Sequence, residues 1–323
     1  MKQRLRDQLR SLRSRVRPSK QASSTQASSK QASSKQAPDK RFEGRTMIVG
    51  TDGRTHPLGA APIPEPPPCP AGWTVGSPDF VVVGAEKSGT SRWMRLIREH
   101  PEVHVAKGLR ELHFWDGFGQ KSPTPADIER YNRYFPRPAT GGVTGEKTPL
   151  YMNFWWVPHC LRTAAPEARI IAMLRDPVDR YVSGRSWHEK FRPGGPDTTR
   201  LDGKFTKEAT ERSMFRSLYA LQIEWLFEAY PREQVLVLQF EACNRDTQGQ
   251  LDRTFDFLGL PHFAPSQELI ERRVNAAWLE PVDLAAERRE LLQQLYTPEV
   301  LRLQALVPDL DLSLWPNFAD LAS

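Results

Sequence analysis

The sequence predicts an α/β protein in which a central, mostly parallel sheet is flanked by helices on both faces. Short apolar runs alternate with helix-like stretches, and the first run ends in a small-residue loop that leads into a helix. Such alternation is typical of a parallel sheet that binds its ligands outside the carboxyl ends of its strands. We therefore expect a three-layer, P-loop-like fold with its functional site at that edge.

The expected strands are apolar runs short enough to be buried on both faces, and they are "FVVVG" (80–84), "RIIAML" (169–174) and "VLVLQF" (235–240). The intervening stretches are long enough for helices, which we place at residues 91–99, 153–164, 178–190, 214–229 and 248–258. One domain accounts for the whole pattern.

The chain that precedes this pattern has a different composition. Residues 1–45 contain 13 Lys or Arg against three Asp or Glu, a net charge of +10, whereas the whole chain carries +6. The segment "QASSTQASSKQASSKQA" repeats small and polar residues that cannot form a core, and residues 62–70 hold six prolines. We predict a basic, disordered tail and linker over residues 1–72 and a folded domain over residues 73–323.

The charge distribution limits the expected partners. Because the folded part lacks an excess of Lys and Arg, we expect no binding of nucleic acid. In the tail, Leu5, Leu9, Leu12 and Val16 share one helical face among arginines, which predicts either a solvated tail or weak contact with an anionic membrane. The sequence has no apolar run near the ~20 residues that span a bilayer and no secretory h-region. Together with three scattered cysteines, this indicates a cytoplasmic protein, or one peripheral at a membrane surface.

The loop after the first strand, "GAEKSGTS" (84–91), has the outline of a phosphate-binding turn. Gly84 and Gly89 satisfy the G-x-x-x-x-G spacing, but Thr90 and Ser91 stand where a P-loop carries Lys and then Ser or Thr. The lysine lies inside the loop instead, at Lys87. Backbone N–H groups at the start of the following helix can bind an anion, and Lys87 can reach a bridging oxygen. Since no dedicated magnesium ligand is evident, we expect no metal requirement.

Arg175 is a second candidate for anion binding. It stands directly after the strand "RIIAML", where an open α/β sheet presents its ligand sites, and its guanidinium suits bidentate contact with phosphate. The alternative is a structural ion pair with Asp176 or Asp179. The presence of Lys87 and Ser183 favours the phosphate role.

Several separated motifs, in order across roughly residues 79–314, resemble the PAPS-dependent sulfotransferases, which transfer a sulfuryl group from 3′-phosphoadenosine-5′-phosphosulfate (PAPS). "LRDPVDRYVSG" (174–184) is similar to the segment that binds the 3′-phosphate, and Arg175 and Ser183 occupy its two contacting positions. The resemblance implies a sulfotransferase fold, PAPS as cosubstrate and PAP as product. It also implies 5′-phosphosulfate contacts from the "GAEKSGTS" loop, namely Lys87, Ser88, Gly89, Thr90 and Ser91.

The acceptor side resembles a narrower group, the heparan sulfate 3-O-sulfotransferases and the N-sulfotransferase domain of the bifunctional heparan enzymes. The similar motifs are "RELHFWD" (110–116), "GEKTPLYM" (145–152) and "RSLYALQIEWL" (216–226). The resemblance implies that Glu111 is the general base, that His113 and Asp116 follow at the family's spacing, and that Lys147 lies near the transferred group. Two alternatives stay open: His113 is itself the base, or Glu111 is a surface carboxylate paired with Arg110.

The sequence departs from the heparan enzymes near its C-terminus. The paired cysteines and the Lys-Gly-Arg loop of those enzymes have no match here. The nearest basic element is "ERRVNAAW" (271–278), from which Arg272 or Arg273 would approach the 3′-phosphate. The departure leaves the donor prediction intact and widens the acceptor to a saccharide, a glycolipid or a hydroxylated metabolite.

The sequence therefore predicts a sulfotransferase that moves a sulfuryl group from PAPS to a hydroxyl, less commonly an amine, of a carbohydrate-like acceptor, by in-line transfer with a glutamate base. The first alternative is a nucleotide-dependent phosphotransferase that requires magnesium and ATP. The second is a catalytically silent nucleotide-binding scaffold that uses its basic tail to hold an acidic partner. The complete set of Lys87, Glu111, Lys147, Arg175 and Ser183 argues against a silent scaffold.

Overall fold

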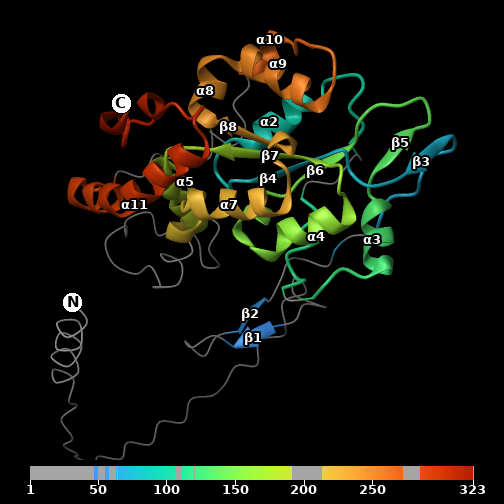
Figure 1. Ribbon diagram of the computed structural model, residues 1–323, viewed down its shortest axis with the longest axis horizontal. Coiled ribbons are helices and arrows are strands. Elements are labelled where there is room, and N and C mark those ends of the chain that lie inside the picture. The colour runs from blue at the N-terminus through green and yellow to red at the C-terminus, as the bar shows by residue number, and fades with distance from the viewer. Residues whose placement is uncertain are drawn as a thin grey trace, which may run out of the picture. The chain divides into compact units, whose positions relative to one another are not determined.

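The computed structural model describes most of the predicted folded part of the 323-residue chain (Figure 1). The described residues are 47–49, 55–57, 63, 65–105, 111–119, 121–190, 213–271 and 284–322, the side chains of 47–49, 55–57 and 187–190 excepted. All of them belong to the unit Gly44–Ser323.

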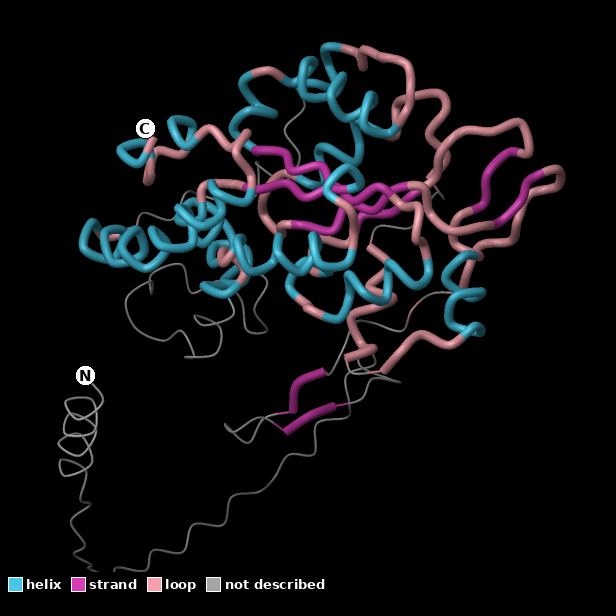
Figure 2. Tube along the Cα trace, in the orientation of Figure 1, coloured by secondary structure: helices cyan, strands magenta, loops and turns pink. Residues whose placement is uncertain are grey.

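The centre of the fold is a four-stranded parallel sheet in the order β6-β4-β7-β8 (Figure 2). Its strands are Gly145–Lys147 (β6), Phe80–Gly84 (β4), Arg169–Leu174 (β7) and Val235–Gln239 (β8). Val82 of β4 pairs with Lys147 of β6 and with Ile171 of β7, and Ile171 pairs with Leu236 of β8. The three predicted strands are confirmed. The sequence does not predict β6, because Gly-Glu-Lys carries no apolar signal.

Helices cover both faces of this sheet (Figures 1 and 2). One face carries Thr90–Ile97 (α2), Phe240–Arg245 (α8) and Thr247–Leu258 (α9). The other carries Trp156–Ala164 (α4), Pro177–Lys190 (α5), Tyr219–Ala229 (α7) and Ala286–Leu306 (α11). Successive side chains of a strand point to opposite faces, so Phe80 and Val82 pack under the first group while Val81 and Val83 pack under the second. This is the predicted three-layer α/β architecture.

The five predicted helices are present with shifted ends. α7 begins at Tyr219 rather than near residue 214 because side-chain contacts hold the preceding turn. There Ser217 Oγ donates to the Pro177 carbonyl at 3.0 Å and accepts from Arg180 Nε at 2.5 Å. Further elements that the sequence did not predict are α11 and Pro125–Asn132 (α3), Gln267–Glu271 (α10), Tyr151–Asn153 (η2), Arg232–Gln234 (η3), Leu312–Leu314 (η5) and Ala319–Leu321 (η6).

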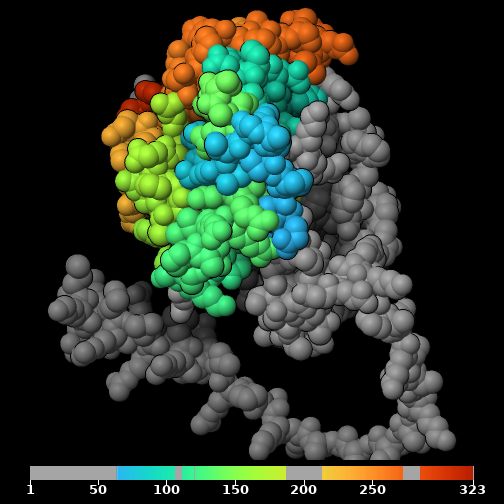
Figure 3. Space-filling view, turned by 90° about the vertical axis from the view of Figure 1, so that its right-hand side faces the viewer, coloured from blue at the N-terminus to red at the C-terminus, as the bar shows by residue number. Residues whose placement is uncertain are grey.

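Two short antiparallel pairs lie outside the main sheet. Trp73–Val75 (β3) pairs with Pro136–Pro138 (β5), and Met47–Val49 (β1) pairs with Thr55–Pro57 (β2). Figure 3 faces the β3 and β5 side of the unit, where blue residues around β3 lie against green residues of the α3 and β5 region. Strands of three residues are too short to carry a periodic apolar pattern, so the sequence predicts neither pair.

The carboxyl ends of the parallel strands bring the predicted site segments to one edge of the sheet. β4 ends at Gly84 and opens into the loop 85–89, β6 ends at Lys147, and Arg175 follows β7 directly. Because β4 lies between β6 and β7, the loop is flanked by both of the other segments. Among the described residues, no helix is both long and apolar enough to cross a membrane.

Candidate active site

The loop between β4 and α2 folds back over the end of β7. Ala85 N donates to the Met173 carbonyl at 2.7 Å, and Ser88 N donates to the Ala85 carbonyl at 3.2 Å. Lys87 and Gly89 both have left-handed backbone conformations, with φ of 70° and 84°. A Cβ on Gly89 would lie 2.7 Å from the Phe240 ring, so glycine is required there by conformation and by space.

The start of α2 follows directly from this loop. Gly89 is its N-cap, and no side chain among the described residues caps the helix. The backbone N–H groups of Thr90 and Ser91 therefore have no side-chain cap, whereas those of Arg92 and Trp93 donate to the Gly89 carbonyl at 3.0 Å. Ser88 and Thr90 are buried, and Ser91 is partly exposed. The loop thus leads directly into the start of α2, and its role in anion binding stays a prediction.

Lys87 lies in a field of mixed charge at this loop. Burial is the main cause that lowers its pKa, and the positive charges of Arg175 and Arg180 lower it further. Glu86 and Glu111 act in the opposite direction. The pKa of Lys87 is therefore affected both by Arg175, the predicted phosphate-binding residue, and by Glu111, the predicted base.

Arg175 is held against the same loop. Its Nη1 donates to the Lys87 carbonyl at 3.4 Å, and its guanidinium carbon lies 4.9 Å from the centre of the Phe240 ring. The buried Nε of Arg175 has no hydrogen-bond partner among the described residues. A guanidinium with a fixed plane and an unsatisfied N–H suits an anionic ligand.

The two carboxylates considered as ion-pair partners for Arg175 have other contacts. Asp176 accepts from the Asn317 side chain at 2.9 Å, and Asp179 pairs with Arg289 at 3.5 Å. Ser183, the other predicted 3′-phosphate contact, is partly buried on α5, eight residues after Arg175. Both predicted residues therefore come from the β7 to α5 segment, as the motif implies.

Lys147 connects the donor side of the site to the predicted acceptor side. From the end of β6, its Nζ donates to Ser91 Oγ at 3.1 Å and to Glu111 Oε1 at 2.5 Å. The Lys147 side chain is 8% exposed and that of Glu111 is 33% exposed, so the buried lysine contacts a carboxylate that solvent still reaches. The structure thus brings together two residues that are 36 positions apart in the chain.

Glu111, His113 and Asp116 form a chain of contacts beyond Lys147. His113 Nε2 lies 3.2 Å from Glu111 Oε2, and His113 Nδ1 lies 2.7 Å from Asp116 Oδ2. The imidazole therefore bridges two carboxylates, and His113 adopts a left-handed backbone conformation with φ of 50°. The predicted spacing of these three residues is consistent with this arrangement.

The pKa values of Glu111 and His113 are shifted from their ordinary values in opposite directions. For Glu111, burial raises the pKa, but the His113 hydrogen bond and the Lys147 charge outweigh burial and lower it to about 2. For His113, burial lowers the pKa, but the hydrogen bonds to Asp116 and Glu111 outweigh burial and raise it to about 9. At neutral pH, Glu111 is ionised and His113 is protonated.

Two cationic residues that the sequence analysis did not single out interact with Glu86 of the loop. Arg216 pairs with Glu86 of the loop. Arg180 of α5 is fully buried and bonds to Ser217 at 2.5 Å and to the Ser213 carbonyl, and burial lowers its pKa. Arg180 lies inside the motif "LRDPVDRYVSG", but sequence alone gives no sign of which arginine in that motif faces the core.

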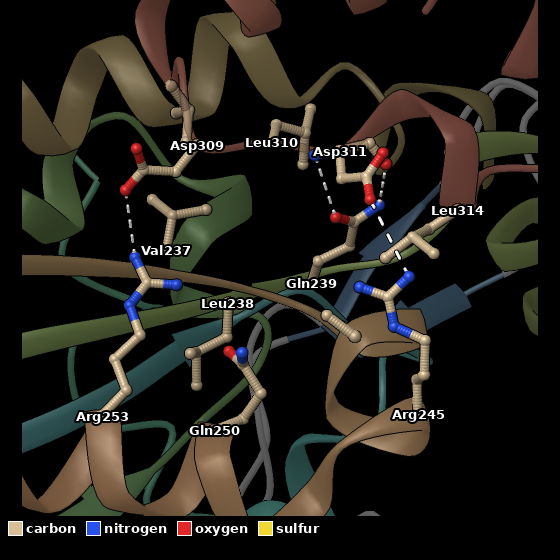
Figure 4. Close-up of a pocket in the computed structure, with 12 residues that line it drawn as sticks. Val237, Leu238, Gln239, Arg245, Gln250, Arg253, Asp309, Leu310, Asp311 and Leu314 are labelled. Atoms are coloured by element: carbon tan, nitrogen blue, oxygen red, sulfur yellow. Dashed lines mark hydrogen bonds and ion pairs between the residues drawn. The ribbon is translucent and has the colours of Figure 1, made fainter.

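Other predicted residues lie outside the described part of the chain. They are Arg110, considered as a partner of Glu111, and Arg272 and Arg273, considered for the 3′-phosphate. Among the described residues, no group of three or more His, Cys, Asp or Glu is placed to hold a metal ion. A cavity of about 150 Å³ between β8, α9 and residues 307–314 contains none of the predicted site residues (Figure 4).

The chain is similar in sequence to one known protein family and to several of its members. Residues 77–280 match the family model described as "Sulfotransferase domain". Human heparan sulfate glucosamine 3-O-sulfotransferase 3B1 is 28% identical over 187 residues, which are 57% of this chain and 46% of that enzyme. Mouse bifunctional heparan sulfate N-deacetylase/N-sulfotransferase 4 is 26% identical over 223 residues, which are 63% of this chain and 25% of that enzyme. The match therefore spans less than half the length of either relative.

A solved structure supports the same grouping. A sulfotransferase from Alicyclobacillus acidocaldarius superposes with a TM-score of 0.55 and 27% sequence identity, covering 75% of this chain and 99% of that chain. The similarity therefore extends over three quarters of this chain.

Proposed function

The chain belongs to the sulfotransferase family, and from this premise we propose that it transfers a sulfuryl group from PAPS to a hydroxyl, less commonly an amine, of a saccharide-like acceptor. We assign Glu111 as the general base. The observation that carries this assignment is the position of Lys147, whose Nζ contacts both Ser91 at the donor helix and Glu111. A base and a donor-binding helix that share one lysine are close enough to act on the same reacting centre.

The donor side fits a nucleotide with anionic groups at two ends. The uncapped start of α2 and Lys87 suit the 5′-phosphosulfate. The unsatisfied Nε of Arg175 suits the 3′-phosphate, with Ser183 on the same segment. The contact between Gly89 and Phe240 leaves no room for a Cβ, so glycine at this position keeps the loop packed against the ring beside Arg175.

The proposed chemistry uses these groups in one in-line step. The acceptor oxygen forms a bond to sulfur while the bond between sulfur and the bridging phosphate oxygen breaks, and the phosphate oxygen keeps the electron pair. The acceptor proton passes to the ionised Glu111 carboxylate. Lys87 and Lys147 supply positive charge beside the leaving oxygen, where negative charge develops.

The low pKa of Glu111 makes it a weak base until the donor is present. Lys147 is one of the groups that lower this pKa, and it also contacts Ser91 on the donor side. An anionic sulfuryl group beside Lys147 competes for its charge, so the pKa of Glu111 rises when the donor binds. Proton acceptance is thereby linked to donor occupancy.

His113 fits a supporting role better than that of the base. Its raised pKa of about 9 keeps it protonated at neutral pH, and a protonated imidazole cannot accept the acceptor proton. Its two N–H groups instead face Glu111 and Asp116, which fixes the orientation of the Glu111 carboxylate. We therefore propose that His113 orients the base.

The acceptor class is proposed from the relatives. Both curated relatives are named as heparan sulfate enzymes, which supports a saccharide acceptor for this chain. Because the matched part is less than half of each relative, we extend the acceptor panel to glycolipids and phenols.

Replacing Glu111 with glutamine tests the proposal. Glu111→Gln keeps the shape of the side chain and removes its capacity to accept a proton, so radiolabel transfer from PAPS should fall by about 10²-fold or more. Calorimetric affinity for PAP should change little, because the 3′-phosphate contacts are untouched. Glu233→Gln is the matched control, since Glu233 is exposed in η3 before the amino end of β8, at the opposite edge of the sheet. That variant should transfer at the wild-type rate.

The same assay separates the alternatives. Near-normal transfer by Glu111→Gln together with loss in His113→Ala would reassign the base to His113. Transfer from ATP that requires magnesium would indicate a phosphotransferase. Binding of PAP without transfer to any acceptor by the wild-type chain would indicate a silent scaffold.

A further inference from the structure

Glu146 is a buried carboxylate beside the proposed site that the mechanism above does not use. It precedes Lys147 on β6, so the two side chains point to opposite faces of the strand. Glu146 is 5% exposed and accepts hydrogen bonds from three hydroxyl groups: Tyr131 at 2.5 Å, Thr148 at 2.7 Å and Tyr151 at 3.2 Å. No Lys or Arg is paired with this carboxylate among the described residues, so hydroxyl groups supply the hydrogen bonds that compensate its burial.

Two of these hydroxyls also hold the backbone of the segment that carries Glu111. Thr148 Oγ1 accepts from the N–H of Leu112 at 3.1 Å and from the N–H of His113 at 3.4 Å. Tyr151 Oη accepts from the N–H of Phe114 at 3.0 Å. Three consecutive backbone N–H groups directly after Glu111 are therefore bound to side chains whose protons point at Glu146.

The direction of these hydrogen bonds depends on the charge of Glu146. A hydroxyl has one proton to donate and two lone pairs to accept with. An ionised carboxylate can only accept, so it takes the hydroxyl protons of Thr148 and Tyr151 and leaves their lone pairs for the loop amides. A neutral amide in its place offers one acceptor oxygen to three hydroxyls, and its NH₂ group competes with the loop for the remaining lone pairs.

We propose that Glu146 is a positioning residue for sulfuryl transfer: through Thr148 and Tyr151 it fixes the backbone of residues 112–114 and thereby holds Glu111 against Lys147. This inference rests on the proposed role of Glu111 as the base. Its physical basis is that a base must be held within hydrogen-bond reach of the proton it removes, and small displacements are costly.

The titration of Glu146 supports this role. Burial raises its pKa to about 7, the hydrogen bonds from Tyr131, Thr148 and Tyr151 act against burial, and the charge of Asp116 raises the pKa further. Tyr131 faces Glu146 from α3, Thr148 from the turn directly after β6, Tyr151 from η2 and Asp116 from the loop. Below pH 7 the carboxyl gains a proton and can no longer accept from all three hydroxyls, so kcat should decline with an acid limb near that pH.

The main test compares the wild-type protein with Glu146→Gln. We expect kcat to fall roughly 10- to 100-fold while KM for PAPS and PAP affinity stay near wild type, because the donor loop is not part of this network. The acid limb near pH 7 should disappear from the variant's profile. The pKa of His113, followed by NMR on histidine-labelled protein, should drop from about 9 toward 6.5, because the imidazole keeps that value only while Glu111 and Asp116 stay in contact.

Two tyrosines provide a matched pair of variants. Tyr131 and Tyr151 are both fully buried and donate to the same oxygen of Glu146, but only Tyr151 accepts a backbone N–H of the loop 111–119. Tyr151→Phe should lower kcat and the His113 pKa as Glu146→Gln does. Tyr131→Phe should cost comparable thermal stability, and because it removes a hydrogen bond that lowers the Glu146 pKa, its acid limb should move to higher pH. On the plateau above that limb, kcat and the His113 pKa should stay near wild type. Equal effects of the two variants on kcat would overturn the proposal in favour of a structural role.

A second pair keeps the test decisive if Glu146→Gln does not fold. Thr148→Ser retains the hydroxyl and should keep kcat, whereas Thr148→Val removes it at similar size and should lower both kcat and the His113 pKa. Unchanged values in Thr148→Val would also overturn the proposal. The His113 pKa is measured without sulfuryl transfer, so it tests the network separately from the base. If Glu111→Gln is active, Glu111 is not the base. A shifted His113 pKa in the Thr148 and Tyr151 variants would still show that the network holds the loop.

Discussion

At the scale of single residues, the candidate site contains charged groups that shift one another's pKa values. Lys147 and His113 both contact Glu111, and each lowers its pKa. Sequence comparison could supply the residue types and their order, because they lie in recognisable motifs. It could not supply the charge state of His113, which depends on two carboxylates reaching the same ring from opposite sides.

This arrangement predicts a defined pH dependence of stability. The folded-state pKa of His113 is raised to about 9 from 6.5, so its ion pairs contribute fully below pH 6.5 and are lost as the pH rises through 9. The difference in unfolding free energy between the wild type and His113→Gln should therefore be constant below pH 6.5 and vanish by about pH 10. Urea denaturation from pH 6 to 10 measures this difference.

The exposed His159 on α4 supplies the control for that series. His159→Gln makes the same substitution at an exposed residue and shows how much of the measured difference comes from the substitution itself. A pH-independent difference for His113→Gln would mean that the two carboxylates do not hold its proton.

At the scale of elements, the strands that carry the site were predictable and their partners were not. β4 and β7 are apolar runs buried on both faces, and their bounds match the predicted strands. β6 has three residues, two of them charged, and only tertiary contacts reveal it as a strand. α11 escaped prediction because exposed leucines such as Leu291 and the interior Pro298 blur its apolar stripe.

The loop between β4 and α2 yields a prediction at this scale. Gly89→Ala introduces a Cβ 2.7 Å from the Phe240 ring at a residue with φ of 84°. The loop must shift away from Phe240, which also stacks on Arg175, so PAP affinity should fall by about tenfold or more. Isothermal titration with PAP measures the change.

Gly72→Ala is the matched control for this substitution. Gly72 has a similar φ of 78°, but a Cβ there meets nothing within 4 Å. It should lose about 1 kcal/mol of stability from the left-handed conformation and keep full PAP affinity. Equal affinity losses in both variants would show that backbone strain, and not the approach of Phe240, governs the loop.

At the scale of the whole molecule, two hydrophobic clusters hold the sheet between its helix layers. One cluster joins α2, α8 and α9 to the sheet, and the other joins α4, α5, α7 and α11. The predicted alternation of strands and helices anticipates this architecture, since it follows from apolar pattern alone. The predicted acceptor side was less accessible to prediction, because residues 111–116 are held by Thr148, directly after β6, and by Tyr151 of η2 rather than by a periodic element.

The N-terminal tail gives the last prediction. Ile63 is partly buried against the larger cluster, and its carbonyl accepts from Arg130 at 3.5 Å, so folded contacts begin before residue 72. Deleting residues 1–62 removes the basic repeat and the short pair of β1 and β2, and it leaves the four-stranded sheet and its helices intact, so melting temperature, PAP affinity and transfer should stay unchanged. Deleting residues 1–70 also removes Ile63 and should cost about 1 kcal/mol of stability through lost apolar packing. If the shorter deletion abolishes binding to vesicles of anionic lipid while transfer persists, the tail is a membrane contact, because the deleted residues include its arginines and its leucine stripe. Loss of transfer in that deletion would instead place part of the tail in the catalytic unit.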